Sequence, residues 1–151
     1  MASYHFHLTQ VKRSRGQSVI AQAAYRAGEK LYSTYYGESS DFTRKRGVVM
    51  AEICLPDHAP REYADRETLW NALEWAETGR KAQLAHSFDI TLMNEFSMEE
   101  NIEMARTFVR EELVSRGMIA DFAIHDPVRP KGAEPNPHIH ILVPIRPLKE
   151  D

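Results

Sequence analysis

The chain has 151 residues, of which 42% are hydrophobic and 27% are charged, values that fit one globular domain. Its single cysteine, Cys54, excludes an internal disulfide and a zinc site built from several thiolates, so we expect a reducing compartment. No apolar run approaches the roughly 20 residues of a membrane-spanning helix, and the first residues lack the basic and apolar blocks of a signal peptide. We therefore expect a cytoplasmic protein without membrane insertion.

The charges are unevenly distributed along the chain. Residues 1–50 carry a formal charge of +5 and residues 51–151 carry −8, which gives the net charge of −3. An acidic protein can present a basic surface to a polyanion when its positive charges are clustered. The net negative charge therefore does not exclude a nucleic-acid partner. The candidate phosphate contacts are seven of the eight basic side chains of residues 1–50, namely Lys12, Arg13, Arg15, Arg26, Arg44, Lys45 and Arg46.

The N-terminal third predicts a strand, a helix and a second strand. Residues 4–11 alternate between apolar and polar side chains, which indicates a strand. Ser18 can cap a helix that runs to about Leu31, because small and apolar residues recur there at helical spacing. The Tyr- and Ser-rich stretch 32–43 indicates a loop or a ragged hairpin. The apolar run 48–55 indicates the second strand.

The rest of the chain continues to alternate between helices and strands. Apolar periodicity predicts helices over 69–81 and from the capping residue Ser97 to near Gly117. It predicts strands over 85–92, 118–125 and 137–143. The resulting order, β-α-β-α-β-α-β-β, indicates an α+β domain with a mostly antiparallel five-stranded sheet.

A pair of histidines near the C-terminus is the first candidate functional feature. His138 and His140 lie in a β-branched run, so on a strand their imidazoles project from the same face. His125 ends the preceding predicted strand, and antiparallel pairing would bring the three imidazoles together. Three imidazoles with open coordination positions make a catalytic metal site. Imidazole nitrogens suit Zn²⁺, Mn²⁺, Co²⁺ or Ni²⁺, and a weaker site also admits Mg²⁺.

The spacing alone leaves a simpler interpretation open. A half-exposed strand can carry two solvated histidines, and His125 can be a surface residue at a strand end. His86 is a further, weaker candidate ligand on the strand predicted over 85–92.

Three segments resemble, in the same order, the motifs of one protein family. They are residues 17–29 (QSVIAQAAYRAGE), 41–45 (DFTRK) and 136–141 (NPHIHI). From residue 4 to about residue 146 the chain is similar to MobA/MobL-type DNA relaxases, mobilization proteins within the histidine-hydrophobe-histidine (HUH) endonuclease superfamily. The resemblance implies a ferredoxin-like or RRM-like sheet with helices packed mainly on one face and a divalent metal ion, Mn²⁺ or Mg²⁺ by expectation, on the other.

The resemblance also implies roles for individual residues. Tyr25 occupies the position of the nucleophile that cuts one DNA strand and stays bound to the new 5′ phosphate. His125, His138 and His140 occupy the metal-binding positions. His5 matches a histidine common near the N-terminus of the family, and we expect it to contact DNA or to orient the metal. In the ferredoxin-like sheet that the resemblance implies, the first strand is central, so we expect it to lie beside the histidine strand.

Some of these roles have rivals within the chain. Asp89 could orient a metal-binding histidine or act as a base toward Tyr25, although the family tends to carry glutamates on this strand and a solvated Asp is the alternative. Tyr25 could instead be a packing residue at the margin of its helix. The rival nucleophiles are the tyrosines of the following segment, Tyr32, Tyr35 and Tyr36.

The function expected from the resemblance is that of a relaxase. Such a domain nicks and rejoins single-stranded DNA at a plasmid origin of transfer, and its expected partners are that DNA, accessory relaxosome proteins and a coupling protein. We expect one relaxase domain over 1–151, which could form the N-terminal part of a longer polypeptide. The alternatives are a rolling-circle replication initiator, in which the tyrosine usually follows the histidine pair, and an RRM-like binding module without catalysis.

Overall fold

The computed structural model describes residues 6–127, 131–132 and 136–145, so the prediction for His5 lies outside the described residues. Seven strands and three α-helices occur in the described chain. The strands are β1 Phe6–Lys12, β2 Lys30–Ser33, β3 Glu38–Asp41, β4 Val48–Cys54, β5 Gln83–Thr91, β6 Ala120–His125 and β7 His138–Pro144. The helices are α1 Val19–Ala27, α2 Arg66–Ala76 and α3 Met98–Glu112, with short 3₁₀ turns η1 Arg13–Arg15, η2 Arg61–Ala64 and η3 Val114–Arg116.

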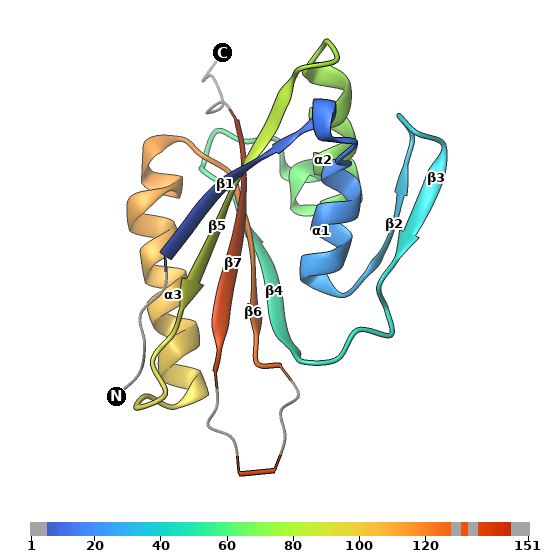
Figure 1. The fold of residues 1–151 in the computed structure, drawn as a ribbon. Helices are drawn as coiled ribbons and strands as arrows, with labels where there is room; N and C mark the ends of the chain where they lie inside the picture. Colours follow the sequence, from blue (N-terminus) through green and yellow to red (C-terminus); the bar gives the residue numbers. More distant parts are fainter. Residues whose placement is uncertain (1–5, 128–130, 133–135, 146–151) are drawn as a thin grey trace.

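Five strands form one antiparallel sheet in the order β1-β5-β7-β6-β4 (Figure 1). This confirms the expected α+β class and five-stranded sheet. The histidine strand β7 lies at the centre of the sheet, between β5 and β6. The N-terminal strand β1 is an edge strand beside β5, so the expectation that it is central and lies beside the histidine strand is wrong.

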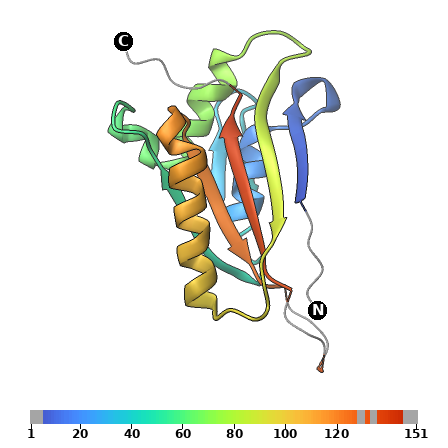
Figure 2. The ribbon, with the colours of Figure 1, turned by 90° about the vertical axis from the view of Figure 1, so that its left-hand side faces the viewer.

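The helices lie on both faces of the sheet, whereas the family resemblance implied mainly one face (Figures 1 and 2). Alternate side chains of β7 explain this arrangement. Ile139 and Ile141 belong to the core that α3 covers, and Leu142 belongs to the core beneath α1 and α2. None of the described helices is both long and apolar enough to cross a membrane.

Helix α1 begins and ends at sequence signals that are visible in the chain. The Ser18 side chain accepts a hydrogen bond from the Ala21 amide, and Gly28 adopts a left-handed conformation with φ of 68°. The helix therefore ends at Ala27 and not near Leu31. The segment that follows is an antiparallel β2–β3 hairpin, one of the two alternatives expected for residues 32–43.

A buried charged network connects α2 to the sheet. The Arg66 guanidinium donates to both carboxylate oxygens of Asp121 on β6 and to Glu29, just beyond α1. The Trp70 indole N–H donates to the same Asp121 carboxylate over 2.8 Å. The network fixes α2 against β6 and so against the face of the sheet that carries the histidines.

Candidate active site

The structure brings the three predicted histidines together on one face of the sheet. In the β6–β7 pair, His125 lies opposite His138, and His140 lies two residues farther along β7. The ring centroids of His125 and His140 are 4.3 Å apart, and those of His138 and His140 are 6.3 Å apart. This face of the sheet is the one that α1 covers, because the opposite face of β7 carries the isoleucines beneath α3.

Asp89 on β5 lies directly opposite His140. Its carboxylate oxygen Oδ1 is 2.5 Å from His140 Nδ1, so Nδ1 carries the proton of this hydrogen bond. Burial disfavours the charged carboxylate, but the hydrogen bond and charge of His140, with Arg26 and His7 nearby, lower the pKa of Asp89 overall. Asp89 thus fixes the orientation of one histidine, one of the roles considered for it.

His125 joins the sheet to α1. Its Nε2 is 2.6 Å from the backbone carbonyl of Arg26, and since a carbonyl only accepts, Nε2 carries the proton. Burial, helped by the nearby His140, Lys45 and Arg26 side chains, lowers the pKa of His125 to about 4. The hydrogen bond to the Arg26 backbone raises this pKa, but by less than burial lowers it. His125 is therefore neutral near pH 7, the protonation state that a metal ligand requires.

Tyr25 lies in the last turn of α1, next to the residue that contacts His125. It is 48% exposed, so it is not a packing residue of the core. The Phe42 ring meets it edge-on at a centroid distance of 5.3 Å. Lys45 Nζ lies 3.3 Å from the Tyr25 ring centroid and also donates to the Tyr25 carbonyl. The phenol thus reaches solvent while its ring is held by two side chains of the segment after β3.

The sequence pattern that defines the MobA/MobL family matches residues 17–151. Conjugal transfer protein TraA of Agrobacterium fabrum (strain C58) is 37% identical over 161 aligned residues, which cover 100% of this chain and 14% of that protein. Probable mobilization protein MobA of Bifidobacterium longum is 37% identical over 146 residues, which cover 97% of this chain and 25% of that protein. The chain belongs to the MobA/MobL family. This confirms the resemblance found in its motifs.

A solved structure extends the MobA/MobL assignment to three dimensions. A structure described as "Molecular Basis of Vancomycin Resistance Transfer in Staphylococcus aureus" matches with a TM-score of 0.88 and 35% identity, over 99% of this chain and 73% of that one. The 43 kDa relaxation protein of Salmonella typhimurium is 30% identical over 94% of this chain and 34% of its own length. The chain therefore spans 14% to 34% of the length of these curated relatives.

The donor set of this MobA/MobL chain suits a divalent metal ion in its chemistry. His125 and His140 each have one nitrogen fixed as a donor by a protein oxygen, so the other nitrogen of each ring is the one that would face a metal ion. Within the described ranges, however, no three His, Cys, Asp or Glu side chains are arranged as a metal-binding group. The hydrogen bond that ties His125 Nε2 to α1 takes one of its two nitrogens out of the donor set.

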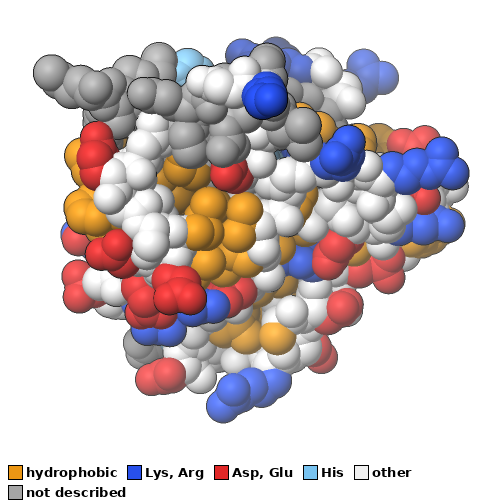
Figure 3. Space-filling view, turned by 90° about the horizontal axis from the view of Figure 1, so that it is seen from below, with side chains coloured by type: hydrophobic (Ala, Val, Ile, Leu, Met, Phe, Trp, Pro, Cys, Tyr) orange, Lys and Arg blue, Asp and Glu red, His pale blue; other side chains and the backbone are white. Residues whose placement is uncertain are grey.

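The predicted phosphate contacts do not all lie on the surface. Arg13 is paired with the buried Glu74, and only 8% of its side chain is exposed, so it is a structural residue and not a free phosphate contact. Arg26 lies beneath the candidate site, where it donates to Gln22 and to the Ser87 hydroxyl. The solvent-exposed candidates are Arg15, Arg44 and Arg46, with Lys12 and Lys45 half-buried. From below, Lys and Arg side chains gather mainly on the side of the β2–β3 hairpin (Figure 3).

Two residues of the site have no counterpart among the sequence predictions. Ser87 lies next to the site on β5 and receives the Arg26 hydrogen bond, and His7 on β1 lies opposite Asp89. The alternation of side chains along a strand could have indicated both residues. Ser87 and Asp89 are two residues apart and so share a face, and the pairing of β1 with β5 places His7 on that same face. What the sequence could not supply was the pairing of β1 with β5.

Proposed function

We propose that this chain is the nicking domain of a conjugative relaxase. In this proposal, Tyr25 cleaves one strand of single-stranded DNA at an origin of transfer and forms a 5′-phosphotyrosyl intermediate. The domain would act with the accessory relaxosome proteins and the coupling protein of the transfer machinery.

One observation carries the proposal, namely the 2.6 Å contact between His125 Nε2 and the carbonyl of Arg26. It joins the histidine face of the sheet to the residue that follows Tyr25, although positions 26 and 125 are far apart in the chain. A phosphate between the exposed phenol and the imidazoles would therefore meet both the nucleophile and the histidines. Membership of the MobA/MobL family supports this assignment of roles.

The chain's own residues would perform distinct tasks in this mechanism. His125, His138 and His140 would hold a divalent ion, Mn²⁺ or Mg²⁺ by expectation, which supplies Lewis-acid polarisation of the scissile phosphate when bound. Asp89 keeps His140 in one tautomer. Phe42 and Lys45 hold the Tyr25 ring, and the buried Arg26 guanidinium supplies positive charge beneath the site.

The covalent step conserves the number of phosphoester bonds. Tyr25 Oη forms a bond to phosphorus, the bond between phosphorus and the 3′ oxygen breaks, and the proton lost by the phenol is balanced by the proton gained at the 3′ hydroxyl. Because one phosphodiester replaces another, the reverse reaction can rejoin the strand without ATP. This reversibility suits nicking and rejoining rather than hydrolysis.

A covalent-adduct assay tests the proposal. The protein is incubated with Mn²⁺ and labelled single-stranded oligonucleotides from candidate origins, and a denaturation-resistant protein–DNA adduct is sought by gel electrophoresis. We expect an adduct with the wild-type chain, its loss in Tyr25→Phe and its loss on chelation of the metal. Tyr32→Phe, which alters another exposed tyrosine, is the matched control and should retain the adduct.

Two outcomes would contradict the proposal. An adduct that persists in Tyr25→Phe would move the nucleophile to Tyr32, Tyr35 or Tyr36. Binding without an adduct at any origin sequence would instead favour a non-catalytic nucleic-acid binding module. The order of the motifs already disfavours a rolling-circle initiator, since Tyr25 precedes the histidine pair.

A further inference from the structure

A second cluster of side chains lies at the tip of the β2–β3 hairpin, against the last turn of α2. Four aromatic residues there are exposed, namely Tyr32, Tyr35, Tyr36 and Trp75, and we call them the aromatic platform. Trp75 alone is 58% exposed, more than any other large hydrophobic side chain in the described chain. Soluble proteins rarely expose several aromatic rings together unless the rings contact a ligand or a partner.

Three rings of the platform, those of Tyr35, Tyr36 and Trp75, contact one another by their edges. Tyr35 meets Tyr36 and Trp75 at centroid distances of 4.9 Å in both cases, with interplanar angles of 71° and 61°. The Arg13 guanidinium lies 4.4 Å from the centre of the Tyr35 ring. Arg13 covers one face of Tyr35, but Tyr36 and Trp75 are not stacked face to face on Tyr35, so a flat ligand can stack on the faces of Tyr36 and Trp75.

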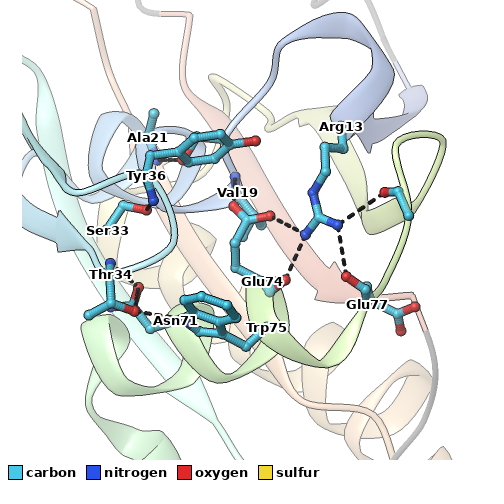
Figure 4. Close-up of polar contacts among 12 residues, drawn as sticks. Arg13, Val19, Ala21, Ser33, Thr34, Tyr36, Asn71, Glu74, Trp75 and Glu77 are labelled. Carbon is cyan, nitrogen blue, oxygen red and sulfur yellow. Dashed lines mark hydrogen bonds and ion pairs between the residues drawn. The ribbon is translucent and has the colours of Figure 1, made fainter.

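Hydrogen bonds hold the platform in one conformation (Figure 4). The Trp75 indole N–H donates to the Thr34 hydroxyl over 2.8 Å. The Asn71 side chain accepts from the Thr34 amide and donates to the Tyr32 carbonyl, so it ties the hairpin to α2 at two points. The Tyr36 amide donates to the Ser33 hydroxyl within the turn. A ligand would therefore meet rings that are already ordered, which reduces the entropy lost on binding.

A buried ion pair supports the platform from below. The Arg13 guanidinium contacts the Glu74 carboxylate over 2.8 Å and also donates to the carbonyls of Glu74, Glu77 and Gly79 (Figure 4). Glu74 is fully buried and also accepts from the Val19 amide at the start of α1. The ion pair thus fixes the platform relative to α1, the helix that carries Tyr25.

Exposed cations border the platform on one side, while Glu38 is exposed beside the hairpin turn and Glu67 is bonded to the Tyr32 amide. Arg15, Arg80 and Lys81 are exposed on the two segments that Arg13 joins, η1 and the loop after α2. The buried carboxylate of Glu74 is paired with Arg13. Aromatic faces bordered by exposed cations bind single-stranded nucleic acid through base stacking and phosphate contacts.

We propose that the aromatic platform is a second DNA-binding site, which stacks bases of the single strand a few nucleotides from the scissile phosphate. This inference rests on the proposed function for the identity of the strand. Val19 is the residue of α1 that contacts Glu74 beneath the platform. Along α1, Val19 and Tyr25 are about 9 Å apart at 1.5 Å per residue, and this length is roughly that of three stacked bases. The platform holds the strand, and Tyr25 at the other end of α1 cleaves it.

Intrinsic fluorescence of the 151-residue chain gives a direct test. Of the two tryptophans, Trp70 is fully buried and bonded to Asp121, so quenching by an added oligonucleotide reports on Trp75. We expect a single-stranded oligonucleotide of about 12 nucleotides, within the site sizes of single-strand binders, to quench this fluorescence. Trp75→Ala should weaken binding about 5- to 20-fold by fluorescence anisotropy of a labelled oligonucleotide, while Trp75→Phe should stay close to wild type.

Phe108→Ala provides the matched control. Phe108 is also an exposed aromatic residue on a helix, but it lies on α3, on the opposite face of the sheet, and its loss should leave the affinity unchanged. Unchanged DNA affinity in both Trp75→Ala and Tyr35→Ala would overturn the proposal. If those variants instead altered self-association in sedimentation experiments, the platform would be a protein contact.

Covalent adduct formation separates this inference from the proposed function. At saturating oligonucleotide, Trp75→Ala should form the adduct at a rate within about twofold of wild type, because it loses binding and not chemistry. Tyr25→Phe should show full Trp75 quenching without an adduct. Quenching without an adduct in the wild type would refute the nicking function but would still support DNA binding by the platform. An adduct without any effect of Trp75→Ala on affinity would refute only the platform.

Discussion

At the scale of single residues, contacts within the candidate site fix the orientation of its side chains. Asp89 and the Arg26 carbonyl each fix one histidine tautomer, and Lys45 and Phe42 together hold the Tyr25 ring. Lys45 was predicted as a phosphate contact, yet its ammonium lies over the Tyr25 ring, and burial together with Arg26 lowers its pKa. Its contacts therefore position the Tyr25 side chain.

Substitution of Lys45 should therefore slow the chemical step. We expect Lys45→Met to reduce the single-turnover rate of adduct formation at saturating DNA by about fivefold, since a cation over an aromatic face contributes about 1 kcal/mol. Arg44→Met removes a charge from the exposed neighbouring position. This control should weaken DNA binding and reduce the salt dependence of the affinity by about one counterion, without a change in the saturated rate. Equal rates for Lys45→Met and the wild type would exclude the positioning role.

At the scale of elements, the segment after β3 is held against the end of β6 by glycine geometry. Gly47 has a φ of 87°, and a Cβ atom at this position would lie 2.9 Å from the carbonyl oxygen of Asp126. The Asp126 amide donates to the Gly47 carbonyl, so the two backbones pass at close range beside His125. Only glycine fits both the left-handed conformation and this approach.

Alanine at this position should separate the basic segment from the end of β6. We expect Gly47→Ala to lower the free energy of unfolding by about 2 kcal/mol or more, from backbone strain and steric overlap together. Gly37 in the β2–β3 turn has a similar φ of 68°, but a methyl group there would have no atom within 4 Å. Gly37→Ala should cost only about 1 kcal/mol by urea denaturation. A smaller loss for Gly47→Ala than for Gly37→Ala would contradict this account.

At the scale of the whole molecule, two helical layers enclose the sheet and the buried Arg66–Asp121 pair joins the site-bearing layer to it. Arg66 Nε is 2.8 Å from Asp121 Oδ2, and the exposed fractions of the two side chains are 10% and 6%. Burial of both charges is costly. The pair is stable because each oxygen of the Asp121 carboxylate accepts a hydrogen bond. Its contribution is to hold α2 and the end of α1 on the sheet.

Removal of one partner should leave a buried charge without its counter-ion. We expect Arg66→Met to lower the free energy of unfolding by about 3 kcal/mol in chemical denaturation. Arg116→Met breaks an exposed pair with Glu112 and should cost less than about 0.5 kcal/mol. If both substitutions had the same small effect, the buried pair would not be a major connection between the layers.

Local patterns in the sequence determined the elements and the candidate chemistry. Apolar periodicity, the Ser18 cap and the β-branched runs depend on neighbouring residues only, so the α+β class and the five strands could be predicted. The motifs around Tyr25 and His138 identified the MobA/MobL family for the same reason, because each motif is a short continuous segment.

Tertiary structure alone decided the contacts between distant residues. The pairing of β1 with β5, the burial of Arg13 against Glu74 and the contact of His125 with Arg26 each join positions more than 60 residues apart. No periodicity encodes such pairs, since they depend on how strands and helices pack once all of them have formed. The sequence therefore determined the candidate site residues, and the packing of α1 on the sheet decided which of them meet.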